Sequence, residues 1–362
     1  MVFNSIFFIF CFLPVFMLIY YLAPGKLRNL LLFLGSLIFY AWGEPVYVIL
    51  MLFSSIFNYY MGTELERLYY DDRKQKINLI FSIIINLAVL VFFKYYGFLL
   101  NTIGGIIGIH IPHPELSLPI GLSFYTFRNL SYLFDIYLSK VSAQRNFLTF
   151  AVYSTMFPYT SAGPIVRYTD IETQLKQRTI NISKFGIGAE LFVKGLAKKV
   201  LLADNLSVLY SSICGHPQMS VFTSWLGILA YTMQLYFDFS GYSDMAIGLG
   251  KMLGFDFNKN FDYPYISTSV SEFWRRWHIS LGSWFRDYIY IPLGGNRVST
   301  LKHIRNILVV WALTGLWHGA SWNFVLWGVY YGLFLLLEKF VLQKYLKKIP
   351  SWLCTVYTML VV

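Results

Sequence analysis

Two histidines stand in sequence contexts that favour chemistry. His318 lies in Trp317-His318-Gly319-Ala320, a short break between two apolar runs, and His278 lies in the aromatic and basic stretch EFWRRWHISLGSWFRDY. A neutral imidazole can act as a general base toward a hydroxyl or thiol near pH 7. A structural alternative stays open for each: a His318 that is only buried, and a His278 that hydrogen-bonds a neighbour and orients its helix.

Other chemistries find little support in the sequence. His110 and His113 stand in HIPH, but two imidazoles without carboxylates make a weak metal site, so we expect no metal. The chain has no GxSxG elbow and no P-loop, which argues against a serine hydrolase and an ATP-driven pump. The three cysteines are scattered, which indicates neither a disulfide framework nor a zinc site.

The composition indicates a polytopic membrane protein. Of the 362 residues, 57% are hydrophobic and 13% are charged, whereas soluble domains have about 45–50% and about 25%. A soluble enzyme and a disordered chain are thereby excluded. Lys and Arg number 29 and Asp and Glu 18, a net charge of +11. In a membrane protein this excess indicates basic cytoplasmic loops, so we expect no nucleic-acid partner.

The first apolar segments predict the topology. We expect spans near residues 4–22, 29–43, 46–62, 77–100 and 118–138. The loops after the first, third and fifth spans carry Lys and Arg, and the loops after the second and fourth carry none. The positive-inside rule then places the N-terminus outside. We predict a multi-pass protein of the cell (inner) membrane, in contact with membrane lipids.

The later segments depart from simple spans. Residues 147–166 are apolar but carry two prolines and are followed by another basic loop, so we expect a re-entrant segment, with an ordinary span as the alternative. We expect a helix over 184–204 and a long span over 221–250, interrupted by Asp238 and Asp244. Intramembrane carboxylates are candidates for functional sites, although these two also suit an interface.

Residues 272–288 are predicted to form one amphipathic helix. At 100° per residue, seven aromatic or apolar side chains and His278 fall in one arc of about 140°. Such a helix lies at the membrane interface or lines a cavity. Trp277 on the apolar side, and Arg275 and Arg276 on the polar side, are candidate substrate-binding residues.

Residues 304–337 predict a hairpin whose turn carries His318. Basic residues flank it on both sides, so the chain must enter the membrane and return. The arms, 304–317 and 321–337, are about 21–26 Å long, shorter than the hydrocarbon core of about 30 Å. The turn therefore lies below the outer surface or at the floor of an outward-facing depression, where desolvation favours the neutral imidazole.

Four stretches resemble the membrane-bound O-acyltransferase (MBOAT) superfamily, most closely its bacterial alginate O-acetyltransferase-like branch. They are LPIGLSFYTFRNLSYLFDIY (118–137), FPYTSAGPIVRY (157–168), YFDFSGYSDMAIGLGKMLGFDF (236–257) continuing into YPYISTSVSEFWRRWHISLGSWFRDYIYIPLGGNR (263–297), and LTGLWHGASWNFVLWGVYYG (313–332). The resemblance covers nearly the whole chain. It implies a single all-α transmembrane domain over 1–362, with a ring of tilted helices and re-entrant or interfacial helices around a central funnel. Family members usually continue with further C-terminal spans.

The resemblance also implies an activity and site roles. The family's catalytic histidine corresponds to His318, and its second functional histidine to His278. The implied reaction moves an acetyl group from acetyl-CoA, with no bound cofactor, to a hydroxyl of an extracytoplasmic partner protein, which acetylates a polysaccharide. Trp317 and Asn323, close to His318 in sequence, are candidates to stabilise the oxyanion. Asp238 is a further candidate for substrate binding.

Three other functions stay open at this point. The same fold transfers D-alanine to teichoic acid, although the stretch YIPLGGNR (290–297) favours the polysaccharide-acetylating branch. A transporter would show repeated halves and matched broken helices, and the sequence shows no repeat. A non-catalytic scaffold of a polysaccharide export machine is the third alternative.

Overall fold

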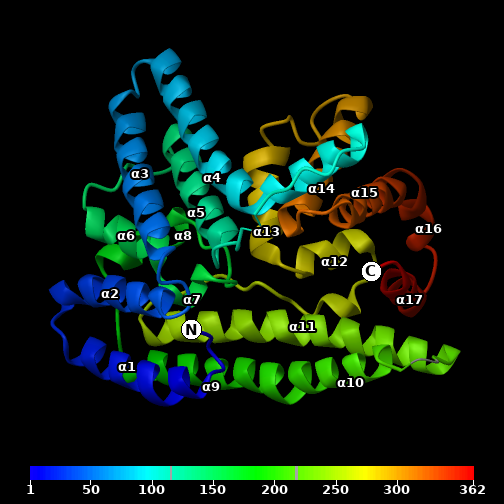
Figure 1. Cartoon of the computed structure of the whole chain (residues 1–362), viewed down its shortest axis with the longest axis horizontal. Coiled ribbons are helices and arrows are strands. Elements are labelled where there is room, and N and C mark those ends of the chain that lie inside the picture. The colour runs from blue at the N-terminus through cyan, green and yellow to red at the C-terminus, as the bar shows by residue number, and fades with distance from the viewer. Residues whose placement is uncertain (115, 217–218) are drawn as a thin grey trace. The chain divides into compact units, whose positions relative to one another are not determined.

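Every regular element is a helix in the computed structural model, which describes residues 1–114, 116–216 and 219–362 (Figure 1). The chain folds as two compact units, each assembled from two stretches of sequence. Unit 1 comprises Met1–Thr63 and Ser142–Asn258, and unit 2 comprises Glu64–Val141 and Lys259–Val362. Because each unit joins distant segments, tertiary contacts determine which side chains meet. The single domain over 1–362 stays a prediction.

The helices of unit 1 reproduce most of the predicted segments. They are α1 (Leu13–Leu22), α2 (Arg28–Ala41), most of α3 (Val48–Arg67), α6 (Phe147–Thr155), α7 (Phe157–Thr160), α8 (Tyr168–Lys176), α9 (Ile182–Ala197), α10 (Asp204–Cys214) and α11 (Val221–Met252). The helix breaks at Met156, between α6 and α7. With 9 and 4 residues, neither half can cross a membrane. Such a break suits the re-entrant interpretation of 147–166.

α11 runs without a break through both predicted intramembrane carboxylates. Lys199 Nζ lies 2.7 Å from Asp238 Oδ1, and Lys198 Nζ lies 2.6 Å from Asp244 Oδ2. Both lysines belong to the π-helical turn Lys198–Ala203 that joins α9 to α10. Pairing with a cation is what makes a carboxylate tolerable in an apolar helix. These two carboxylates therefore link the helices of unit 1.

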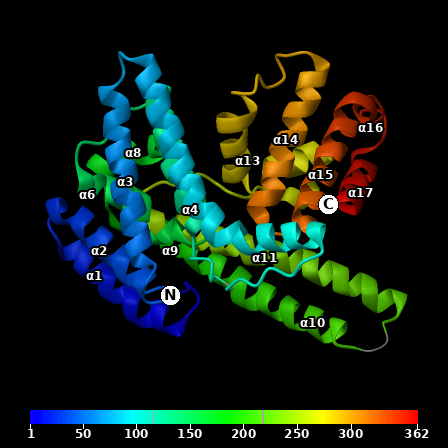
Figure 2. The same cartoon turned by 45° about the horizontal axis from the view of Figure 1, so that its top comes forward.

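Glycines let α9 and α11 approach closely, and the two helices lie side by side in both views (Figures 1 and 2). A Cβ atom added to Gly195 would lie 2.5 Å from the Gly241 carbonyl oxygen, and one added to Gly248 would lie 2.5 Å from the Gly188 carbonyl oxygen. Any side chain there would force the backbones apart. Small residues serve helix packing in membranes in this way.

We expect Gly248→Ala to destabilise unit 1 by about 1–3 kcal/mol, because overpacking shifts the backbone. Gly186→Ala on α9 is the matched control, since nothing lies within 4 Å of its added Cβ. Alanine is the better helix former by up to about 1 kcal/mol, so this variant should melt at the same or a higher temperature. Thermal unfolding of the detergent-solubilised protein measures both. Equal melting temperatures would contradict the packing argument.

Unit 2 contains the predicted hairpin. Its helices are α4 (Asp72–Ile107), α5 (Leu122–Tyr137), α12 (Val270–Arg276), α13 (Ile279–Phe285), α14 (Thr300–His318), α15 (Trp322–Leu337), α16 (Gln343–Leu346) and α17 (Ser351–Val361). α14 and α15 pack against each other (Figure 2). α5 covers the predicted span 118–138, but most of its side chains are buried. It is therefore enclosed by protein rather than exposed to lipid.

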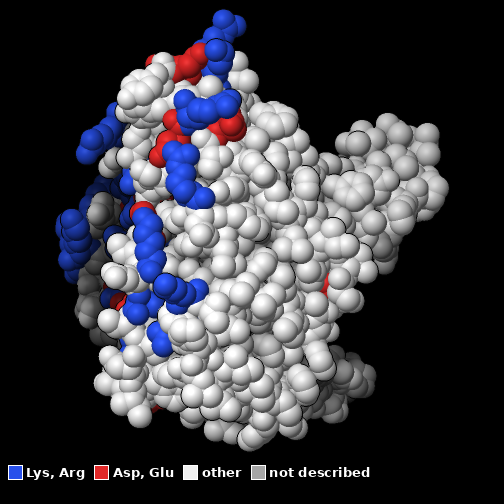
Figure 3. Space-filling model, turned by 90° about the vertical axis from the view of Figure 1, so that its left-hand side faces the viewer, with Lys and Arg blue, Asp and Glu red and all other residues white. Residues whose placement is uncertain are grey.

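Three helical stretches among the described residues are long and apolar enough to cross a membrane: Val48–Arg67, Asp72–Ile107 and Trp322–Leu346. Basic side chains gather at the turn between the first two, visible at the top of Figure 3 together with a few acidic ones. They include Arg67, Arg73, Lys74 and Lys76. This is the charged loop from which the orientation of the chain is predicted.

The prediction of one helix over 272–288 is wrong. α12 ends at Arg276 and α13 begins at Ile279, and a π-helical turn follows from Arg286. His278 stands in the break with φ 45° and ψ 55°, the left-handed region that side chains other than glycine rarely adopt. A helical wheel assumes one continuous rotation, so its arc does not describe this segment.

Candidate functional site

His278 and His318 line one cavity of about 520 Å³ within unit 2. Its walls come from α12, α13 and α14, so residues from two distant parts of the sequence meet there. The ring of Trp317 packs against both histidines, with its centroid 5.9 Å from that of His278 and 5.0 Å from that of His318. The structure thus brings together the two histidines that the sequence singles out.

The hairpin turn stands where it is predicted, because α14 ends at His318 and α15 begins at Trp322. Two side chains of α4 support the end of α14. Lys94 donates to the carbonyl of Trp317, and Tyr95 Oη lies 2.6 Å from the carbonyl of Leu316. Carbonyls in the last turn of a helix lack intrahelical partners, and a cation there suits the helix dipole. Lys94 and Tyr95 therefore position His318.

Lys94 is not among the residues predicted to be functional, and it lies inside the predicted span 77–100. The sequence does contain a signal for Lys94, because Lys94 is the one basic residue within the predicted span 77–100. An intramembrane cation is a candidate functional residue together with its partner. That its partner is a backbone carbonyl of α14 emerges only from the structure.

His318 is partly buried and held by ring packing. The centroid of its ring lies 4.8 Å from that of Trp327 and 6.4 Å from that of Phe324. No hydrogen bond from another described residue engages its ring nitrogens. A base needs a nitrogen within reach of the proton that it takes. This arrangement leaves the imidazole of His318 available to a substrate.

His278 is nearly inaccessible, with 2% of its surface exposed. The flanking helices α12 and α13 have seven residues each, too few to span a membrane. Burial lowers the pKa of His278 well below its usual value, and the charge of His318 lowers it further. The ring is therefore neutral around pH 7, with one nitrogen donating and the other accepting.

Two more of the predicted binding residues line the cavity. Trp277 is buried, and Arg275 is exposed without an ion pair to any other described residue. Arg276 turns elsewhere: its Nη2 atom lies 2.8 Å from Glu272 Oε1, as expected for an i, i+4 pair. Of the two arginines, Arg275 is therefore the one whose charge can meet an anionic ligand.

The remaining predicted residues lie outside the cavity. Asn323 is exposed in the first turn of α15 and is not among the residues that line the cavity. Asp238 belongs to unit 1, where it pairs with Lys199. Their roles in substrate binding stay predictions.

Two tryptophans bring indole N–H groups to this region. Trp274 lines the cavity, and Trp317 packs against both histidines. The Nε1 atoms of both are buried, and neither has a hydrogen-bond partner among the described residues. A buried donor without a partner is rare and calls for a ligand or a water. The sequence predicts Trp317 as an oxyanion donor, whereas Trp274 is predicted only to belong to the apolar arc of 272–288.

A buried carboxylate supports α12 at its first turn. Glu338 is 3% exposed, and its oxygens accept from the backbone N–H groups of Val270 at 2.6 Å and Ser271 at 2.9 Å. The Ser271 hydroxyl also donates to it, at 2.7 Å. A negative charge at a helix N-terminus satisfies orphan donors and suits the helix dipole. Glu338 therefore fixes the position of the helix that leads into His278.

We expect Glu338→Ala to lower stability by about 1–3 kcal/mol, because it leaves buried N–H groups without an acceptor. Glu190→Ala is the matched control, since the ion pair of Glu190 with Lys194 on α9 is exposed. Exposed i, i+4 pairs contribute about 0.3–0.5 kcal/mol. Thermal unfolding in detergent compares the two. A Glu338→Ala protein that melts with the control would show that the carboxylate does not hold α12.

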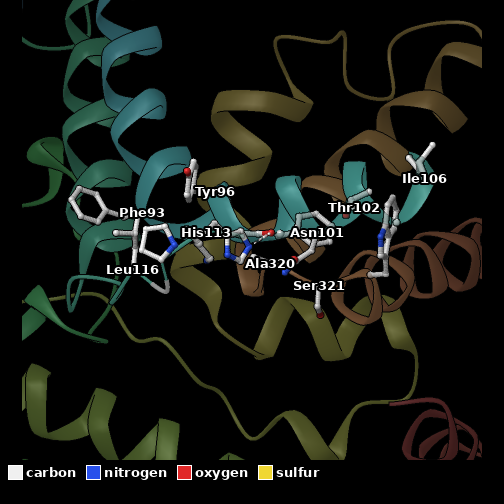
Figure 4. A pocket seen from close by; sticks show the side chains of 15 residues that line it. Phe93, Tyr96, Asn101, Thr102, Ile106, His113, Leu116, Ala320 and Ser321 are labelled. Atoms are coloured by element: carbon white, nitrogen blue, oxygen red, sulfur yellow. Dashed lines mark hydrogen bonds between the residues drawn. The ribbon is translucent and has the colours of Figure 1, made fainter. Parts of the chain in front are cut away.

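A second cavity, of about 810 Å³, borders the turn after His318 (Figure 4). α4 forms one wall, and Ala320, Ser321 and Trp322 contribute from the turn and the start of α15. His113, in the loop after α4, also lines this cavity, and its Nε2 lies 3.2 Å from the carbonyl oxygen of Gly97. The residues just after His318 thus face one cavity while His318 lines the other.

Comparison with known proteins identifies the class. The model of the MBOAT, membrane-bound O-acyltransferase family matches residues 42–347. The chain belongs to this family and is a multi-pass membrane protein.

Several named proteins of this kind are similar to the chain in sequence. The chain is 45% identical to the probable alginate O-acetylase AlgI of Pseudomonas aeruginosa, over 94% of this chain and 66% of that protein. It is 35% identical to the peptidoglycan O-acetyltransferase of Helicobacter pylori, over 98% of this chain and 75% of that protein. The teichoic acid D-alanyltransferase of Bacillus subtilis is 29% identical over 67% and 64%. The chain thus spans about two thirds of the length of its first relative.

Proposed function

We propose that this protein is an O-acyltransferase that moves an acetyl group from acetyl-CoA in the cytoplasm to an extracytoplasmic hydroxyl. The product is an O-acetylated cell-surface or exported polysaccharide. The cavity shared by His278 and His318 carries this proposal. The names of the relatives that act on alginate and peptidoglycan support the polysaccharide acceptor.

The chemistry assigns His318 the role of general base. Its imidazole takes the proton of the acceptor hydroxyl while the oxygen attacks the thioester carbonyl carbon. A C–O bond forms, and the negative charge moves to the carbonyl oxygen. When the C–S bond breaks, the imidazolium gives this proton to the departing thiolate, which leaves as the thiol. The indole N–H groups of Trp317 and Trp274 are candidate donors to the transient oxyanion.

The two cavities suit access from two sides. Arg275 and Arg286 line the cavity of the histidines, where they favour an anionic donor such as a CoA phosphate. The second cavity, beyond Ala320, is the proposed acceptor side. With the N-terminus outside the inner membrane, the spans would form the ring around a central funnel that the family resemblance implies. The acceptor hydroxyl belongs to an extracytoplasmic partner protein, which passes the acetyl group to the polymer.

D-Alanyl transfer is the second candidate, supported by the relative that acts on teichoic acid. It uses the same base and a thioester donor, so the cavities alone do not separate the two. A transporter or a scaffold of an export machine requires no base at all. The identity of the acyl donor therefore distinguishes acetyl transfer from D-alanyl transfer, and the absence of any transfer would indicate a transporter or a scaffold.

The test uses inside-out membrane vesicles that contain the protein and its extracytoplasmic components. Labelled acetyl-CoA and labelled D-alanyl carrier protein are supplied separately, and label is followed into polysaccharide, protein and free acid. We expect label to be transferred from acetyl-CoA and not from the D-alanyl carrier protein. Transfer from the carrier protein alone would replace the acetyl donor, and no His318-dependent transfer from either would support the transporter or scaffold.

A further inference from the structure

A segment just before the 3₁₀ turn Pro264–Ile266 enters the break between α12 and α13. The backbone N–H of Asp262 donates to the carbonyl of Arg276 at 2.9 Å, and that of Ile279 donates to the carbonyl of Asn260 at 2.9 Å. These bonds lie on either side of Trp277 and His278. They supply the partners that a continuous helix would have supplied, and so stabilise the left-handed conformation of His278.

The side chain of Asn260, which is 1% exposed, sits at the centre of this arrangement. Its Oδ1 atom lies 3.2 Å from the backbone nitrogen of Ser280, 2.9 Å from Ser280 Oγ and 3.1 Å from His278 Nδ1. The backbone nitrogen of Ser280 can only donate. The atom of Asn260 that faces it must therefore be the oxygen and not the amide nitrogen.

This orientation of the amide decides where the proton of His278 lies. Because Asn260 Oδ1 can only accept, the Nδ1 atom of His278 must donate to it. In a neutral imidazole the other nitrogen then carries the lone pair. For the neutral ring, the tautomer thus follows from the backbone N–H of Ser280.

We propose that Asn260 is a positioning residue that holds His278 as the Nδ1–H tautomer, so that its Nε2 accepts a hydrogen bond from an N–H or O–H group of the acceptor beside the hydroxyl that reacts, in the cavity shared with His318. This inference rests on the proposed function for the identity of the donor to Nε2. It assigns the two histidines different roles: His318 removes the proton of the reacting hydroxyl, and His278 orients the acceptor through a neighbouring donor group. A carboxamide here does for the second histidine what a carboxylate does for the base of a catalytic triad.

Nitrogen-15 NMR of histidine-labelled protein in nanodiscs tests the tautomer directly. The His278 signals are assigned by their absence in His278→Asn, a residue that tolerates the left-handed backbone. We expect a protonated Nδ1 and an unprotonated Nε2 in the wild type and in Asn260→Asp, which keeps the accepting oxygen. Asn260→Leu should lose this signature. A wild-type His278 protonated at Nε2 would overturn the inference.

Kinetics of the same variants test whether the tautomer matters. Asn260→Leu should lower kcat by about 100-fold or more, with the KM for acetyl-CoA nearly unchanged, as for a base held in the wrong tautomer. Asn260→Asp should retain activity within about 10-fold, since it preserves the acceptor. Asn205→Leu, at an exposed asparagine of α10, should leave both constants unchanged.

The outcomes separate this inference from the proposed function. A wild type that transfers no acetyl group, yet shows the Nδ1–H signature and its loss in Asn260→Leu, would overturn the proposed function and leave the role of Asn260 in holding the tautomer. An active wild type whose kcat falls in Asn260→Leu without any change of tautomer would overturn the inference. Because the tautomer is read in the wild type, an Asn260 variant that fails to fold does not prevent a decision.

Discussion

Replacing His318 with alanine should reduce acetyl transfer by about 100- to 10,000-fold, the range for loss of a general base. His318 lines the cavity at the end of α14, and no hydrogen bond from another described residue engages its ring. Acetyl-CoA should still bind, because Arg275 and the aromatic side chains that line the cavity remain. Label transfer from acetyl-CoA in membrane vesicles, normalised to folded protein by gel filtration, measures the loss.

His110→Ala is the control for this substitution, since His110 is exposed and lies outside both cavities. It should transfer acetyl groups at the wild-type rate. If His318→Ala matched it, the role of His318 as the base would be wrong. A loss of activity with loss of folded protein would instead be resolved by His318→Gln, which preserves size and polarity.

Removing the indole N–H of Trp317 should have the second largest effect. Trp317→Phe keeps an aromatic ring against both histidines but deletes the buried Nε1 donor. If this N–H stabilises the oxyanion, kcat should fall by about 100- to 1,000-fold with little change in KM, as for other oxyanion donors. Trp274→Phe should act in the same direction, because its Nε1 is also buried without a described partner.

Steady-state kinetics with varied acetyl-CoA separate binding from catalysis. The matched control is Trp225→Phe on α11, since Trp225 is exposed and far in sequence from the site. A rise in KM at constant kcat would assign the tryptophan to donor binding and contradict the oxyanion role. Rates for Trp317→Phe equal to those of the control would exclude both.

Local patterns were sufficient to predict the hairpin and the place of His318. Two apolar runs separated by Trp317-His318-Gly319-Ala320 correspond to α14 and α15, because a glycine-containing break ends one helix and a new apolar run begins the next. The membrane character likewise follows from composition, since a soluble fold cannot cover so much apolar surface. Both features depend only on residues that are close in sequence or on averages over the chain.

The geometry of the site depends on contacts between distant segments. The apolar pattern of 272–288 fits a continuous helix, and the break at His278 arises from the backbone and side chain of Asn260. Lys94 supports the end of α14 from a helix more than two hundred residues earlier. Such hydrogen bonds form only when the tertiary structure brings donor and acceptor together, and buried polar groups then override local propensity because leaving them without partners is costly.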